Sequence, residues 1–203
     1  FSPVNATASG YHRHQQLKLD EMLDDLSPAG LDRQRQFYRT FRERLARSVK
    51  PEDLAPDDRA DYDILTDQIA LALLELDEIQ SWRHNPTVYV ELVGNALFQP
   101  HVLDYAPKKE RLAHIIARLE KVPTFLAQAR QNLAEAPEIW TTVAMEENEG
   151  NLNLIDRIIR AGLPDDARDG YDRAAGPALE ALRSFQEYLK TDLAKKSGHD
   201  WRS

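Results

Sequence analysis

Residues 62–105 read YDILTDQIALALLELDEIQSWRHNPTVYVELVGNALFQPHVLDY, and this stretch decides the fold. Its first half has apolar residues at helical spacing on two separate faces, which is typical of a helix that lies between neighbours. Asn85-Pro86 then ends the helix, because the residue before a proline is driven out of the α region. We therefore expect a long central helix over about residues 57–84. Its two faces are marked by Tyr62, Leu65, Ile69, Leu73, Leu76 and Ile79, and by Ile64, Leu71 and Leu74.

The rest of the chain repeats the same period of about 3.6 residues, and no segment alternates with period two for long enough to predict a strand. Ser27-Pro28 predicts a helix start, because a capping hydroxyl precedes a proline at the first helical position. Pro86 predicts a short helix that is followed by a loop over residues 99–107. Pro123 is expected to kink or break a later helix, Gly150 is a weak point of the next one, and Gly176-Pro177 is able to bend the last helix near its start.

These features predict an all-α fold. We expect an antiparallel multi-helix bundle with proline-kinked helices and no significant sheet, because the connections are short. Residues 1–203 are expected to form a single helical domain.

The composition excludes several classes of function. Lys plus Arg number 26 against 34 Asp plus Glu, a net charge of −8, and the basic residues are scattered among acids. This pattern disfavours a nucleic-acid partner. No run of about 18 apolar residues occurs, so no membrane-spanning helix is expected. The chain has no cysteine, which rules out disulfides, thiolate nucleophiles and zinc-cysteine sites in it.

The histidines lack the spacings of known metal-binding helices. None of the six is followed by glutamate, so the His-Glu motif of zinc peptidases is absent, and no Glu-x-x-His tetrapeptide of a di-metal bundle occurs. Glu110 and His114 lie one helical turn apart and are interpreted as a solvated contact, with a metal role as the alternative. His12 and His14 are interpreted as part of a surface loop or terminus, with metal or substrate contact as the alternative. We assign no catalytic or metal-binding residue to this chain.

Two further polar segments have a structural and a functional interpretation. Glu146, Glu147 and Glu149 are interpreted as a solvated face, since adjacent helix positions point in different directions. The asparagine-rich segment 148–153 is expected to be a kink or a loop facing a cleft.

The best polar and aromatic cluster follows the predicted central helix. As a structural feature, it is a helix terminus where aromatic side chains form a corner and Asn85 caps the next turn. As a functional feature, it lines a pocket in which Arg83 or His84 meets an anionic group. The candidate cleft-lining residues are Trp82, Arg83, His84, Asn85 and Tyr89.

The order of several short motifs resembles a bacterial family called domain of unknown function 885. The resemblance covers most of the chain and corresponds to the N-terminal half of family members. The motifs are Ala6-Thr7-x-x-Gly10-Tyr11-His12, Asp61-Tyr62-Asp63-x-Leu65, Trp82-x-x-Asn85-Pro86-x-x-Tyr89, Tyr105-Ala106-Pro107-x-x-x-Arg111, and Arg118-Leu119-x-x-x-Pro123-x-Phe125-Leu126-x-x-Ala129-x-x-Asn132-Leu133.

This resemblance implies a longer helical protein that looks like a zinc metallopeptidase and is exported, either periplasmic or lipid-anchored. The zinc motif of the family belongs to its C-terminal half, so zinc is implied only for that half and no cofactor is implied here. Phe1 and the tail Gly198-His199-Asp200-Trp201 also suggest a piece of a longer chain.

Two hypotheses follow. In the first, the chain is the non-catalytic N-terminal region of a metallopeptidase-like protein, forms one wall of a substrate cleft, and has the missing C-terminal half and a peptide substrate as partners. In the second, it is an independent helical scaffold or binding domain for a protein or peptide, with an exposed apolar surface over residues 82–105.

Overall fold

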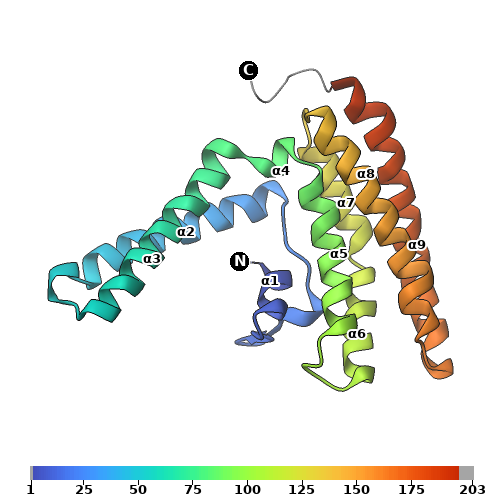
Figure 1. Ribbon diagram of the computed structural model, residues 1–203, viewed down its shortest axis with the longest axis horizontal. Helices are drawn as coiled ribbons and strands as arrows, with labels where there is room; N and C mark the ends of the chain where they lie inside the picture. The colour runs from blue at the N-terminus through green and yellow to red at the C-terminus, as the bar shows by residue number, and fades with distance from the viewer. Residues whose placement is uncertain (1, 197–203) are drawn as a thin grey trace. The chain divides into compact units, whose positions relative to one another are not determined.

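The computed structural model describes residues 2–196, and the predicted tail segment Gly198–Trp201 lies outside them. Over this range the all-α prediction is confirmed, since helices account for nearly all of the regular structure (Figure 1). The chain divides into two compact units, each packed mainly within itself. Unit 1 comprises Phe1–Asp25 and Trp82–Ser203, and unit 2 comprises Leu26–Ser81.

Unit 2 is a helical hairpin. Helix α2 (Pro28–Ser48) begins as predicted, with the Ser27 hydroxyl accepting a hydrogen bond from the Gly30 amide at 3.1 Å. A short 3-10 turn, Pro51–Asp53, leads to α3 (Pro56–Leu74), which ends in a π-helical turn, Glu75–Ile79. Arg35 of α2 joins the two helices, because it donates to Asp77 at 2.9 Å and to the Leu76 carbonyl at 2.9 Å.

The predicted helix over residues 57–84 needs two corrections. It does not run to His84, since Gln80 has a left-handed φ of 53° and a separate helix α4 (Ser81–His84) follows. Its second apolar face is also not buried, with Ile64 58% exposed, Leu71 54% and Leu74 47%. Within unit 2, α3 packs on α2 alone, so only the face through Ile69 and Leu73 is covered.

Unit 1 contains the remaining helices and a small hairpin. The strands β1 (Arg13–His14) and β2 (Leu17–Lys18) pair antiparallel and are two residues long, in accord with the prediction of no significant sheet. The helices are α1 (Pro3–Ala8), α5 (Thr87–Val102), α6 (Lys108–Leu119), α7 (Val122–Asn132), α8 (Glu138–Asn153) and α9 (Arg168–Tyr188). Shorter turns are the 3-10 segments Leu19–Glu21, Asp165–Ala167 and Ala194–Lys196, and the π segments Leu154–Ile159 and Leu189–Leu193.

The core of unit 1 lies around α5, which packs against α6 and α8, while α9 covers α6, α7 and α8 (Figure 1). Tyr89, Val90, Val93 and Leu97 of α5 are fully buried. Gly94 allows the close approach of α8, because a Cβ added there would lie 2.7 Å from the Asn151 side-chain oxygen. The helix at the centre of this core thus follows the predicted terminus.

Helix α5 is longer than the short helix predicted from Pro86. It continues to Val102 through Pro100, which was expected to lie in a loop. Proline lacks an amide hydrogen, so it leaves the carbonyl four residues earlier without its helical donor. That carbonyl belongs to Ala96, and Arg118 Nη1 donates to it at 2.8 Å. A side chain from α6 therefore makes Pro100 tolerable inside the helix.

The predicted break at Pro123 is confirmed, because α6 ends at Leu119 and α7 begins at Val122, with Pro123 in its first turn. Gly150 and Pro177 do not interrupt their helices, since Gly150 lies within α8 and Pro177 within α9. The segment 148–153 is helical and not a loop, since Asn148 donates to the Leu182 carbonyl at 3.0 Å and Asn151 to the Val90 carbonyl at 2.8 Å. These asparagines fix interhelical packing.

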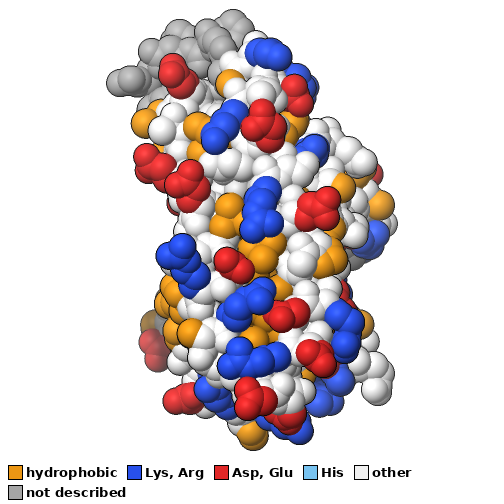
Figure 2. All heavy atoms as spheres, turned by 90° about the vertical axis from the view of Figure 1, so that its right-hand side faces the viewer, with side chains coloured by type: hydrophobic (Ala, Val, Ile, Leu, Met, Phe, Trp, Pro, Cys, Tyr) orange, Lys and Arg blue, Asp and Glu red, His pale blue; other side chains and the backbone are white. Residues whose placement is uncertain are grey.

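The described helices and the face in Figure 2 bear on the membrane and charge predictions. No helix among the described residues is long and apolar enough to cross a membrane. On the face shown in Figure 2, lysines and arginines are interspersed with acidic side chains and do not gather into a patch of one sign.

Candidate functional site

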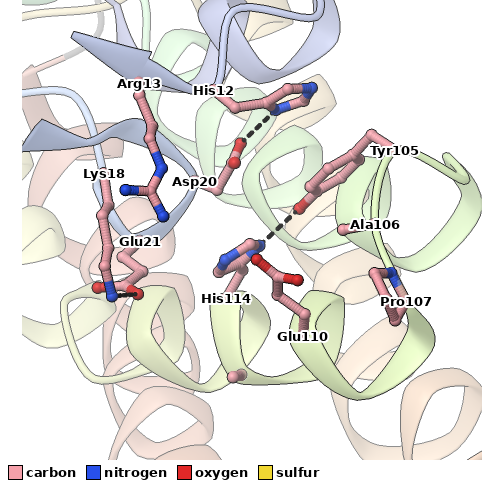
Figure 3. A pocket seen from close by; sticks show the side chains of 11 residues that line it. His12, Arg13, Lys18, Asp20, Glu21, Tyr105, Ala106, Pro107, Glu110 and His114 are labelled. Atoms are coloured by element: carbon pink, nitrogen blue, oxygen red, sulfur yellow. Dashed lines mark hydrogen bonds and ion pairs between the residues drawn. The ribbon is translucent and has the colours of Figure 1, made fainter.

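The candidate site is a polar pocket of about 430 Å³ in unit 1. One wall comes from the N-terminal segment. Gly10, with φ of 74°, turns the chain after α1 so that the β1–β2 hairpin and the turn Leu19–Glu21 can follow. This wall contributes His12, Arg13, Lys18, Asp20 and Glu21 (Figure 3).

The facing wall comes from the loop after α5 and from the start of α6. It contributes Tyr105, Glu110 and His114. Arg111 fixes this loop, because it donates to the carbonyls of Pro100 at 2.9 Å, His101 at 3.0 Å and Ala106 at 2.9 Å. The first two carbonyls belong to the last turn of α5, where a cation is favourable.

A buried hydrogen-bond chain lies beneath the pocket and ties its two walls together. Arg118 of α6 is 0% exposed and donates to the Thr7 hydroxyl at 2.6 Å. The Thr7 hydroxyl in turn donates to Asp20 at 2.7 Å, and His12 Nδ1 lies 3.1 Å from the same Asp20 oxygen. Arg118 also donates to the Met22 carbonyl at 3.1 Å. A guanidinium and a carboxylate are thus linked through one hydroxyl.

Two stacking contacts fix the aromatic part of the pocket. The His12 ring stacks on Tyr105 at 4.5 Å between centroids, and Tyr105 lies parallel to His114 at 5.9 Å. The Tyr105 hydroxyl is 3.0 Å from His114 Nδ1. Burial raises the pKa of Tyr105 to about 12 and lowers the pKa of His114 below its usual 6.5. At neutral pH Tyr105 therefore donates to Nδ1, and the hydrogen of the neutral imidazole is on Nε2.

The pocket does not fit the zinc that the resemblance implies for the family. No group of three or more His, Asp or Glu side chains that could hold a metal ion occurs within residues 2–196. His12 Nδ1 is engaged by Asp20, and His114 Nδ1 by Tyr105. The arrangement offers charged and hydrogen-bonding groups for binding a polar molecule.

The structure places the predicted cleft-lining residues elsewhere in unit 1. Tyr89 is buried and donates to the Trp82 carbonyl at 2.5 Å. Asn85 accepts from both the amide and the hydroxyl of Thr87, at 3.0 and 2.7 Å. His84 Nδ1 lies 3.9 Å from Glu135, and the Arg83 carbonyl accepts from the Ala134 amide at 3.1 Å. The interpretation as a packed corner explains Trp82, Asn85 and Tyr89, and the cleft role of the cluster stays a prediction.

The other candidate residues from the sequence, His14, Glu110, His114 and Glu147, also have defined positions in the structure. His14 lies in β1 with its Nδ1 2.9 Å from the Tyr11 hydroxyl. The interpretation of Glu110 and His114 as a solvated pair is wrong for His114, which is 7% exposed. Glu147 is half-buried, and desolvation together with nearby Glu91 raises its pKa above the usual 4.5.

Sequence reasoning missed Asp20, Tyr105 and Arg118 as members of one site. A signal was present, since Thr7, His12, Tyr105 and Arg118 all belong to the motifs that carry the family resemblance. These residues are far apart in the chain, and the packing of α1 against α5 and of the Leu19–Glu21 turn against α6 brings them together.

Comparison with known proteins agrees with that resemblance. A family model described as "Bacterial protein of unknown function (DUF885)" matches residues 3–202. The fold is similar to that of "a putative lipoprotein of unknown function from Shewanella oneidensis", with a TM-score of 0.79 and 19% identity. This match covers 95% of the chain described here but only 35% of the Shewanella protein. None of the curated proteins matches the chain. The chain therefore belongs to the bacterial protein family of unknown function DUF885.

Proposed function

We propose that this chain is a non-catalytic helical region of a larger metallopeptidase-like protein, in which it forms one wall of a peptide-binding cleft. The observation that carries the proposal is the fold match to the Shewanella protein, of which this chain covers 35%. In that protein the same fold is thus one part of a longer chain. Catalytic groups and zinc would come from the C-terminal half that the family resemblance implies.

The side chains of this protein fit a non-catalytic role that supports peptide binding. The sequence has no His-Glu pair, and the pocket histidines are held by Asp20 and Tyr105. Arg83 is an exposed cation next to Trp82 and is suited to an anionic group of a peptide. Trp82, His84, Asn85 and Tyr89 would position that residue.

The test compares the protein spanning residues 1–203 with the product of the coding sequence extended past Ser203. The shorter protein is expected to hold no stoichiometric zinc by elemental analysis and to cleave no peptide in a mass-spectrometric library screen. The longer one is expected to hold one zinc and to lose peptide cleavage on chelation. One equivalent of zinc in the 1–203 protein, with chelator-sensitive hydrolysis, would overturn the proposal.

Arg83→Gln then tests the cleft role in the longer protein. We expect KM to rise roughly threefold to tenfold with kcat little changed, because a contact to the bound peptide is lost without touching the chemistry. Arg157→Gln, at another exposed position of unit 1, is the matched control and should change neither constant. Equal effects of the two variants would remove Arg83 from the cleft.

A second candidate, an independent binding domain, is favoured by a groove in unit 2 rather than by residues 82–105. Of the surface expected over residues 82–105, Phe98, Val102 and Leu103 are exposed, whereas Tyr89, Val90, Val93 and Leu97 belong to the core. The groove in unit 2 measures about 560 Å³ and is lined by Phe37, Phe41, Leu65, Leu71 and neighbouring residues. A stop codon directly after Ser203 would favour this candidate, and continued coding into a His-Glu motif would favour the first.

A further inference from the structure

The charges of the polar pocket in unit 1 are not all neutralised by the protein. Lys18 and Glu21 form an ion pair at 2.8 Å. Asp20 is held by Thr7 and His12, with Arg118 one hydroxyl away. Each of these charged groups therefore has a partner of suitable chemistry within the unit.

Arg13 and Glu110 differ from these groups. Both line the pocket, and among the described residues neither side chain makes a hydrogen bond or an ion pair. Arg13 reaches in from β1 and Glu110 from the first turn of α6, so that they face the pocket from opposite walls (Figure 3). The Glu110 carboxylate lies close enough to act electrostatically on Tyr105 and His114. The pocket thus presents one unpaired cation and one unpaired carboxylate.

We propose that this pocket binds a small zwitterion, an α-amino acid or a short unblocked peptide, with its carboxylate on Arg13 and its ammonium group on Glu110. A guanidinium matches a carboxylate in geometry and charge, and an ammonium group donates well to a carboxylate. A volume of about 430 Å³ lies in the range of small-molecule pockets. One unpaired charge of each sign suits a zwitterion better than an anion or a cation.

The aromatic residues supply orientation. Neutral His114 accepts from Tyr105 through Nδ1, which leaves its Nε2 hydrogen as a donor for a carboxylate oxygen beside Arg13. The stack of His12 on Tyr105 fixes the tyrosine in place. The buried link from Arg118 through Thr7 to Asp20 ties the two walls together.

This inference does not rest on the peptidase proposal. Zwitterion binding belongs to unit 1 of this chain and requires neither zinc nor a catalytic half. It can hold when no peptide is cleaved, and it can fail while the longer protein remains an active peptidase. The two proposals are therefore distinguishable.

The test is isothermal titration calorimetry of the 1–203 protein against single amino acids and the peptides Gly-Gly, Ala-Ala and Gly-Gly-Gly. At least one is expected to bind with a Kd of about 1 mM or lower. Its N-acetylated and its C-amidated forms, which each lack one charge, should both bind at least about tenfold more weakly. Preference for single amino acids or for peptides distinguishes the two sources of the ligand.

Variants assign the two charges. Arg13→Gln and Glu110→Gln should each weaken binding of the unblocked ligand about tenfold or more. Glu110→Gln should not weaken the N-acetylated form further, and Arg13→Gln should not weaken the amidated form further. Lys109→Gln, next to Glu110 but outside the pocket lining, is the matched control and should change Kd less than about twofold. Both pocket residues are exposed, so the variants should fold, which circular dichroism checks.

Two results would overturn the proposal. One is the absence of binding by every member of the panel at concentrations up to about 10 mM. The other is binding that the blocked ligands or the two pocket variants leave unchanged.

Discussion

Thr7 is the single hydroxyl that links the buried Arg118 to Asp20, and Thr7→Val should test that link directly. Valine has nearly the same shape, so the variant removes the hydroxyl without opening a cavity. Thr7 is 1% exposed, accepts from Arg118 Nη2 at 2.6 Å and donates to Asp20 at 2.7 Å. Both bonds involve an ionic partner, and such bonds contribute roughly 1.5 to 3 kcal/mol each.

The net loss is smaller than the sum of the two bonds. Arg118 Nη2 keeps the Leu19 carbonyl at 3.3 Å, and Asp20 keeps His12 at 3.1 Å. The added methyl group also gains about 0.8 kcal/mol from burial. We therefore expect Thr7→Val to lower the free energy of unfolding by about 2 to 4 kcal/mol, with little change in the denaturant slope.

The assay is urea unfolding followed by tryptophan fluorescence. Trp82 and Trp140 belong to unit 1, and unit 2 contains no tryptophan, so the signal reports the unit that contains the link. Thr142→Val is the matched control, because the Thr142 hydroxyl is exposed and bonds only to the Glu138 carbonyl of its own helix, at 3.0 Å. It should change stability by no more than about 0.5 kcal/mol.

Thr7→Ser supplies the positive control. It keeps the hydroxyl, so it should retain most of the stability that Thr7→Val loses and should fold even if the valine variant does not. A loss below about 1 kcal/mol for Thr7→Val, or equal losses for the serine and valine variants, would refute the assigned role of the hydroxyl.

Four further substitutions probe packing, protonation and charge. Gly94→Ala should destabilise unit 1 by about 1 to 3 kcal/mol in urea unfolding, because the added Cβ would lie 2.7 Å from the Asn151 side-chain oxygen. Gly150→Ala should instead stabilise the unit by about 0.4 to 1 kcal/mol, because a Cβ at this position meets open space. Burial lowers the pKa of His114 below 6.5, so near and below that pH the unfolded state binds more protons than the folded state, and stability is lost as pH falls. His114→Gln should therefore flatten the loss of stability between pH ~7.5 and ~5. An unchanged slope of stability against pH would contradict the assignment. Asp77→Asn removes a carboxylate whose pKa is lowered by Arg39 and Arg35 of α2. It should destabilise unit 2 by about 1 kcal/mol or less in low salt, and the loss should be smaller in molar salt because salt screens the ion pairs. Circular dichroism follows the unfolding.

Local sequence rules predicted the fold class and several element boundaries. The apolar period of about 3.6 residues is a property of the chain itself, and it identified the helices without tertiary information. Ser27-Pro28 fixed the start of α2 because a capping hydroxyl and a preset φ act within one turn. The motifs were also sufficient for the family resemblance, which the match over residues 3–202 confirmed.

Rules of the same kind failed where a distant side chain compensates for a local defect. Pro100 was expected to lie in a loop, yet Arg118 supplies the donor that the Ala96 carbonyl lacks inside a helix. The polar segment around Gly150 was expected to break, yet Asn148 and Asn151 find carbonyl partners on other helices. No local pattern contains these partners.

The burial of helices and the position of the site were decided by the tertiary structure. The sequence by itself determined that residues 57–79 would be helical and apolar on two faces, since both properties depend on neighbours within a few turns. It did not determine which face would be covered, because that depends on which helices pack nearby, and α2 covers one face of α3 within unit 2. The pocket has the same origin. The sequence identifies His12, Tyr105 and Arg118 as separate residues, but only the docking of the N-terminal segment beside α6 brings them into one site. Their hydrogen bonds and ring contacts act over a few ångströms, whereas the residues in contact are about a hundred positions apart in the chain.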